Sequence, residues 1–276
     1  MANAPKPTTV KNESSATASN LFATLVIPIC LIIGACLYKF VLGDPNNFID
    51  NNVENLPKLN NFAGMAYKGG VIVPILMGML LMVIVFSVER FIVIGKATGA
   101  SGLDTFVKKI QGLLNANNIE AAIAECDKQK GSVANVIKSG LKKYREMEVE
   151  TNMDTDQKCL AIQKDIEEAT TLEMPMLEQN LTIIATLVSI GTLMGLLGTV
   201  TGMIKAFGGL GASGAPDSAA LATGISEALI NTATGIGTST CAIIMYNILT
   251  SKIDKLTYAI DEAGFSIIQT YASTHK

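Results

Sequence analysis

Two apolar stretches of the chain carry hydroxyl side chains at similar spacing. One is GLLGTVTGMI, residues 195–204, and the other is EALINTATGIG, residues 227–237. Neither contains a histidine, a cysteine or a pair of carboxylates, so they lack the groups of nucleophilic catalysis and metal binding. A threonine hydroxyl donates and accepts hydrogen bonds without carrying a charge. The question is why two apolar helices carry such groups, and a single carboxyl group at Glu227.

Both stretches lie inside segments that are long enough to cross a hydrocarbon core of about 30 Å. Only 16% of the 276 residues are charged, and the mean hydropathy is +0.38. Four spans are predicted, at 21–43, 71–94, 181–205 and 219–250. The first follows a polar lead and has no A-x-A cleavage site after it, so a retained span is favoured over a signal peptide. The fold class is therefore an all-α polytopic membrane protein.

The rest of the chain is divided by the same pattern. Apolar residues at three- and four-residue intervals predict helices at 106–115, 119–129, 133–147 and 159–180, the last running into the third span with a kink at Pro175. Lys and Arg near the span ends favour a cytoplasmic C-terminus, and Lys205 alone argues against it. The remaining segments are a disordered tail (1–20), a periplasmic segment (44–70), a cytoplasmic helical domain (95–180), a periplasmic loop (206–218) and a cytoplasmic helix with its tail (251–276).

Each of the last two spans has a small or polar face. On a helical wheel of about 100° per residue, one arc of the fourth span holds Glu227, Asn231, Thr234, Thr238 and Cys241, with Gly224, Ala228, Thr232, Gly235 and Ser239 beside it. The third span places Gly191, Gly195, Gly198, Gly202, Thr192 and Thr199 on one side. Small residues four apart let helices approach closely, so packing is the favoured role of the glycines. Each threonine hydroxyl is expected to bond a carbonyl three or four residues back.

Glu227 calls for a separate explanation, because a carboxyl group within a span is costly. It has either a function or a place near the membrane boundary, within reach of water. At the end of the second span, Glu89 and Arg90 are expected to snorkel toward the boundary and to pair.

The last two spans resemble the ExbB/TolQ/MotA family of ion-driven motor proteins. The resemblance lies in LTIIATLVSIGTLMGLLGTVTGMIKAF (181–207) and GISEALINTATGIGTSTCAIIMYNIL (224–249), and is closest to ExbB. VERFIVIGKA (88–97) and LEQNL (177–181) extend it, so that it covers roughly 71–260. The extra first span, Thr201, and Asn231 beside Thr232 depart from the simplest ExbB pattern, and leave open whether the ion is H⁺ or Na⁺.

The resemblance implies a homopentamer around a dimer of a single-span, ExbD-like partner that carries the titrating aspartate. Proton flow would then drive a TonB-like protein that energises outer-membrane transport from the bacterial inner membrane. The family's cavity threonines match Thr199 and Thr232, and its glutamate matches Glu227. The expected ion-pathway lining is Thr199, Thr232, Glu227, Asn231, Thr234 and Thr238, and the expected packing residues are Gly191, Gly195, Gly198, Gly202, Gly224 and Gly235.

Other function classes remain as alternatives. A TolQ-like, gliding, secretion or flagellar motor subunit would share these helices, and a non-conducting scaffold would use the small residues for packing alone. A self-contained transporter is disfavoured, since no inverted repeat is visible. An enzyme is least favoured: the single histidine, His275, lies in the tail, and five scattered cysteines show no metal or redox spacing. No cofactor is predicted. A net charge of −3 gives no basic patch for nucleic acid, so lipids and protein are the expected partners.

Overall fold

The computed structural model describes residues 13–212 and 218–275, and the side chains within them except those of 13–20, 209–212 and 218–220. Helices dominate, and the described residues contain no β-strand, only an isolated bridge between Phe48 and Pro57. Four helices are long and apolar enough to cross a membrane, which confirms the all-α polytopic class. These candidate spans are Leu21–Leu42, Ile72–Asn115, Leu181–Gly208 and Leu221–Thr274.

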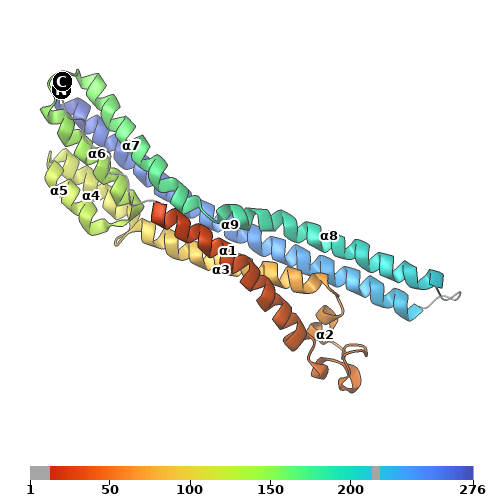
Figure 1. The fold of residues 1–276 in the computed structure, drawn as a ribbon. Helices are drawn as coiled ribbons and strands as arrows, with labels where there is room; N and C mark the ends of the chain where they lie inside the picture. Colours follow the sequence, from red (N-terminus) through yellow and green to blue (C-terminus); the bar gives the residue numbers. More distant parts are fainter. Residues whose placement is uncertain (1–12, 213–217, 276) are drawn as a thin grey trace. The chain divides into compact units, whose positions relative to one another are not determined.

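The chain divides into two compact units. The first unit contains the described residues up to Phe86 and Thr182–Tyr246. Its long helices are α1 (Glu13–Leu37), the first part of α3 (Ile72–Thr98), α8 (Leu181–Ala212) and the first part of α9 (Ser218–Thr274) (Figure 1). Between α1 and α3 lie a π-helical turn (Tyr38–Leu42), two 3-10 turns (Pro45–Asn47 and Ile49–Asn51) and α2 (Phe62–Tyr67).

The second unit contains Ser87–Leu181 and the described residues from Asn247 onward. Besides the remaining parts of α3 and α9, it consists of α4 (Leu103–Asn115), α5 (Ile119–Gln129), α6 (Gly131–Val149) and α7 (Thr155–Glu178). The four helices predicted from periodicity are thus confirmed, with ends shifted by a few residues. Asn118 caps α5 by accepting from the Ala121 backbone N–H.

The core of the second unit is built on two fully buried tyrosines. The rings of Tyr144 on α6 and Tyr271 on α9 meet edge to face, with centroids 4.8 Å apart. The Tyr271 hydroxyl donates to the Met147 carbonyl at 2.8 Å, so the polar end of this ring is also satisfied. Burial raises the pKa of the Tyr144 hydroxyl and raises that of the Cys126 thiol on α5 to about 12. All five cysteines are free.

Three boundaries differ from the sequence prediction. Pro175 does not kink a continuous helix: α7 ends at Glu178, and α8 begins at Leu181 after Asn180, which adopts φ +65°. Asn tolerates this left-handed conformation better than most residues, so the break falls there. The loop expected from residue 206 is helical to Ala212, and residues 213–217 lie outside the described part. Of the tail expected at 1–20, residues 13–20 belong to α1 and 1–12 are not described.

Candidate ion-pathway face

The helices α8 and α9 meet through glycines along their length. A Cβ added to Gly235 would lie 2.7 Å from the Gly191 carbonyl oxygen and from the Gly195 Cα. At the other end, a Cβ on Gly202 would lie 2.8 Å from the Gly224 carbonyl oxygen. Real Cβ atoms do not approach backbone so closely, so only glycine fits at these contacts. Thr192 adds a hydroxyl bond of 2.9 Å across the interface to Ser239.

Asn231 lies at the centre of this contact and is fully buried. A Cβ on Gly198 would overlap its side chain, so this glycine makes the room for the amide group. The Asn231 Nδ2 donates to the Gly69 carbonyl oxygen, 2.9 Å away in the turn that precedes α3. Its Oδ1 is buried and has no hydrogen-bond partner. The Asn231 amide group thus joins α8, α9 and the turn before α3. Its Oδ1 can still accept a hydrogen bond from a further donor.

Glu227 lies one turn before Asn231 on α9 and is 8% exposed. Its Oε1 accepts from the Lys205 Nζ of α8 at 2.6 Å. The lysine side chain is 57% exposed. The same Oε1 packs on Gly70, whose φ of +76° and lack of a side chain both suit glycine. We call Lys205, Glu227, Asn231, Gly69 and Gly70 the Glu227 cluster.

The threonine hydroxyls bond to their own helices. Thr199 donates to the Leu196 carbonyl at 2.6 Å, and Thr232 to the Ala228 carbonyl at 3.0 Å. Thr234 and Thr238 each bond the carbonyl four residues back, at 2.8 and 2.9 Å. With its proton engaged, such a hydroxyl presents its lone pairs as acceptors. Thr199, Thr232 and Thr234 are half-buried, and Thr238 is 1% exposed.

The structure therefore sorts the expected residues into two groups. Glu227 and Asn231 come together in the Glu227 cluster, and Thr238 is also buried. Thr199, Thr232 and Thr234 remain partly open on the surfaces of α8 and α9. Lys205 and the Gly69–Gly70 turn were not predicted as site residues. Lys205 had appeared only as an exception to the charge rule, and the sole hint at the turn was two adjacent glycines before a span.

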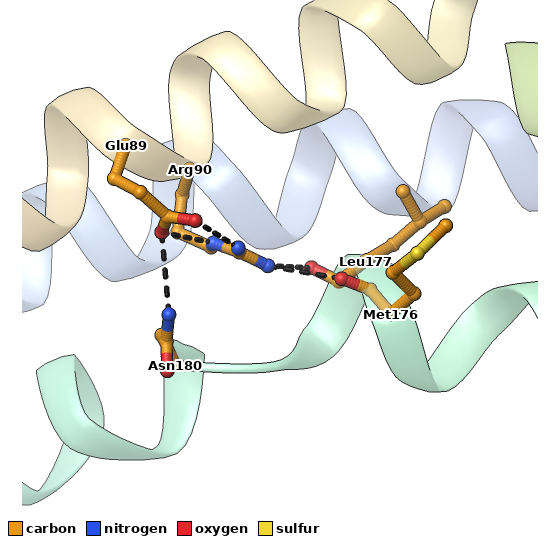
Figure 2. Close-up of polar contacts among 5 residues, drawn as sticks. All are labelled: Glu89, Arg90, Met176, Leu177 and Asn180. Atoms are coloured by element: carbon orange, nitrogen blue, oxygen red, sulfur yellow. Dashed lines mark hydrogen bonds and ion pairs between the residues drawn. The ribbon is translucent and has the colours of Figure 1, made fainter. Parts of the chain in front are cut away.

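A second polar cluster lies in the second unit (Figure 2). Glu89 and Arg90 of α3 form an ion pair, with the Arg90 Nε 2.6 Å from the Glu89 Oε2. Arg90 Nη1 donates to two carbonyls in the last turn of α7, Met176 at 3.0 Å and Leu177 at 3.3 Å. The Asn180 Nδ2 lies 3.4 Å from Glu89 Oε2. The expected pairing is confirmed, but Arg90 is only 2% exposed and so does not snorkel into solvent.

Arg90 is buried because the end of α7 needs it. The last four carbonyls of a helix have no partner within the helix, and a positive charge there also complements the helix dipole. Arg90 supplies a hydrogen-bond donor for these carbonyls and a positive charge near them. Glu89 compensates that charge. Among the described residues, no group of three His, Cys, Asp or Glu side chains is placed to hold a metal ion.

Part of the chain matches the model of a known protein family. Residues 128–262 match the model of the MotA/TolQ/ExbB proton channel family. This part of the chain is therefore similar to the MotA/TolQ/ExbB family. It contains α8 and most of α9, and every residue expected in the ion pathway or in the glycine contact. The first candidate span and the segment up to α3 lie before it.

Relatives within the MotA/TolQ/ExbB family carry two kinds of name. The chain is 27% identical to the Tol-Pal system protein TolQ of Pseudomonas aeruginosa over 56% of this chain and 67% of that protein. It is 30% identical to the putative biopolymer transport protein ExbB-like 3 of Synechocystis, covering 40% and 53% of the two chains. It is 40% identical to the biopolymer transport protein ExbB of Helicobacter pylori over 29% and 55%. The chain thus spans just over half the length of these two ExbB-type relatives.

Proposed function

We propose that this chain is the ion-conducting subunit of an ExbB-type motor, which draws on the proton gradient to energise outer-membrane transport. The proposal combines the match to a proton channel family with the polar residues on α8 and α9. The observation that carries it is the Glu227 cluster. A carboxylate and an amide with a free acceptor are buried between two glycine-packed apolar helices, although packing alone would favour apolar side chains.

In this proposal the ion path runs beside the partly open threonines of α8 and α9. Thr199, Thr232 and Thr234 present acceptor oxygens there, because their protons are engaged with their own helices. Such oxygens stabilise a proton or a hydrated ion beside a partner's carboxyl group without adding a charge of their own. Glu227, Asn231 and Thr238 are more deeply buried than these threonines, and the proposed path has the Glu227–Lys205 ion pair at one end.

The proposed assembly follows the ExbB resemblance. Five copies of this chain would surround a dimer of a single-span ExbD-like protein, in the bacterial inner membrane with the C-terminus in the cytoplasm. A TonB-like protein would receive the work. The partly open threonines fit a face that is completed by another subunit, because a polar surface on a span must meet protein or water.

Partner-dependent ion flux into liposomes tests the proposal. Wild type and the Thr199→Val, Thr232→Val double variant are compared under separate H⁺ and Na⁺ gradients, with an ExbD-like partner bound. Valine keeps the shape of threonine and removes only the hydroxyl. We expect flux with the partner that collapses in the double variant, and the gradient that supports it identifies the ion. Flux unchanged by both substitutions would place the path elsewhere, and no flux with any partner would favour the non-conducting scaffold.

A TolQ-type motor is the second candidate, and one comparison favours it. The match to Pseudomonas TolQ runs over 154 residues, against 112 and 80 residues for the two ExbB-type relatives. Co-purification of the chain with an ExbD-like protein or with the corresponding subunit of a Tol-Pal system separates the two. We expect the stable complex to form with the ExbD-like protein, and a preference for the Tol-Pal subunit would assign the chain to the second type.

A further inference from the structure

The segment of residues 43–71, between the first two candidate spans, is folded against the end of the first span. The hydroxyl of Tyr38 donates to the Tyr67 carbonyl at 2.8 Å, and the two rings stack with centroids 4.7 Å apart. Asn47 donates to the carbonyls of Val41 and Leu42 at 2.9 and 3.0 Å. Since Tyr38, Val41 and Leu42 close the candidate span Leu21–Leu42, these bonds hold the segment at the level where that span ends.

The segment also has a small core of its own. Phe48 is fully buried, and the Tyr67 ring packs edge to face on it. The Lys68 Nζ donates to the carbonyls of Val53 and Glu54 at 3.0 and 3.1 Å and lies 5.5 Å from the centre of the Phe48 ring. These contacts cross the segment from one end to the other. The segment is therefore held in one conformation, and its core determines which of its side chains are exposed.

Large apolar side chains are left outside at every third position. Leu56 is 66% exposed, Leu59 96%, Phe62 83% and Met65 37%. Phe62 and Met65 are three residues apart on α2, so they share one side of that short helix. We call these four residues the 56–65 edge. At the neighbouring span ends, Phe40 and Val71 are also exposed, at 71% and 77%.

We propose that the 56–65 edge inserts into the bilayer surface, where the lipid headgroups meet the acyl chains. The segment is tethered to a span at each end, and its contacts with Tyr38, Val41 and Leu42 keep it beside the membrane. The exposed Phe40 and Val71 add apolar side chains where the segment joins the first and the second candidate span. Leucine and phenylalanine on a polar, lysine-containing body are the composition of interfacial anchors, which bury their apolar face about 5–10 Å into this boundary.

The anchor would fix how α1 and the start of α3 are rotated in the bilayer, because interfacial contacts set the rotation of a span. It lies outside residues 128–262, so it is a property of the part of the chain that precedes the family match. The proposal does not depend on ion conduction.

Tryptophan fluorescence tests the anchor without interference, because the chain contains no tryptophan. Leu59→Trp and Phe62→Trp are made separately in the full chain, and Glu54→Trp is the matched control at an exposed, charged position of the same segment. Each is reconstituted into phosphatidylcholine vesicles whose acyl chains carry bromine at a defined carbon. Emission wavelength and quenching are recorded with brominated lipid and, separately, with iodide in the water.

We expect blue-shifted emission from both edge variants, and quenching by brominated lipid several-fold stronger than in Glu54→Trp, with weak quenching by iodide. Two results would overturn the proposal. Emission and iodide quenching equal to those of the control would place the edge in water. Protection from both quenchers would mean that protein, such as a second copy of the chain, covers it. The two positions guard against local disturbance, since both must agree for the anchor to stand.

Discussion

Glu89 and Glu227 are each paired with a base, and the two pairs are built differently. Arg90 bonds Glu89 and two carbonyls at the end of α7, and it is 2% exposed (Figure 2). Lys205 makes one bond, to Glu227, and more than half of its side chain meets solvent. A base tied at several points cannot leave without opening the fold, whereas a base tied at one point can. We therefore propose that the Glu89–Arg90 pair is structural and that the Glu227–Lys205 pair is functional.

The largest expected effect comes from removing Arg90. Arg90→Met leaves the Glu89 charge uncompensated and the carbonyls of α7 unbonded, so we expect a loss of about 3 kcal/mol in the free energy of unfolding. Unfolding in increasing SDS measures it. Glu89→Gln is the control and should lose less, because Arg90 still caps α7. If Arg90→Met changes the free energy of unfolding by less than about 0.5 kcal/mol, as an ordinary surface substitution does, the Glu89–Arg90 pair is not structural.

The next effect concerns the glycine contact behind Glu227. A methyl group at Gly198 would overlap Asn231, so Gly198→Ala should separate α8 from α9 and lower stability by about 1–3 kcal/mol. Gly237→Ala is the matched control on α9, since nothing lies within 4 Å of its added Cβ. That variant should be neutral or slightly stabilising, because alanine restricts the unfolded chain. Equal losses from both substitutions would show that α8 and α9 do not depend on close approach at Gly198.

Breaking the pair in the Glu227 cluster should have a smaller effect on stability. In Glu227→Gln the amide keeps the shape of the carboxyl group, and the half-exposed Lys205 is free to turn to water. We expect a change of about 1 kcal/mol or less, as for ion pairs that reach solvent. The same SDS titration measures it beside Arg90→Met. A loss as large as that of Arg90→Met would show that both pairs are structural.

The smallest effect is expected at the Lys109–Glu125 ion pair in the second unit. This pair is a reference for the Glu89–Arg90 and Glu227–Lys205 pairs. The Lys109 ammonium, 2.6 Å away, holds the pKa of Glu125 below its ordinary value of 4.5. Because the folded pKa is below the unfolded one, the stabilisation is complete above the unfolded value and disappears as the pH falls through the folded value. Lys109→Met should raise this pKa, observed by NMR titration of the carboxyl carbon. Lys128→Met, which removes a contact of 3.6 Å, should raise it less, and the reverse order would contradict this ranking.

The sequence was sufficient for features that repeat along one helix. Periodicity predicted the helices of the second unit and the polar arc of α9, because a helix presents residues three and four apart on one face. It was insufficient for features that join distant segments. The partner of Glu227 lies 22 residues away on another helix, and the partner of Asn231 lies 162 residues away. The sequence predicts that Arg90 snorkels toward the membrane boundary, since nothing in its local sequence reveals the uncapped end of α7.

The most direct test of whether Glu227 is functional and Glu89 structural compares the variants Glu227→Gln and Glu89→Gln. Ion flux per folded protein is measured for each in the same vesicles, with the single-span partner bound. Both substitutions remove one carboxylate and keep its shape. We predict that Glu227→Gln loses flux while its stability stays close to wild type, and that folded Glu89→Gln conducts. Wild-type flux in Glu227→Gln, or loss of flux in Glu89→Gln alone, would contradict the assignment of the two pairs.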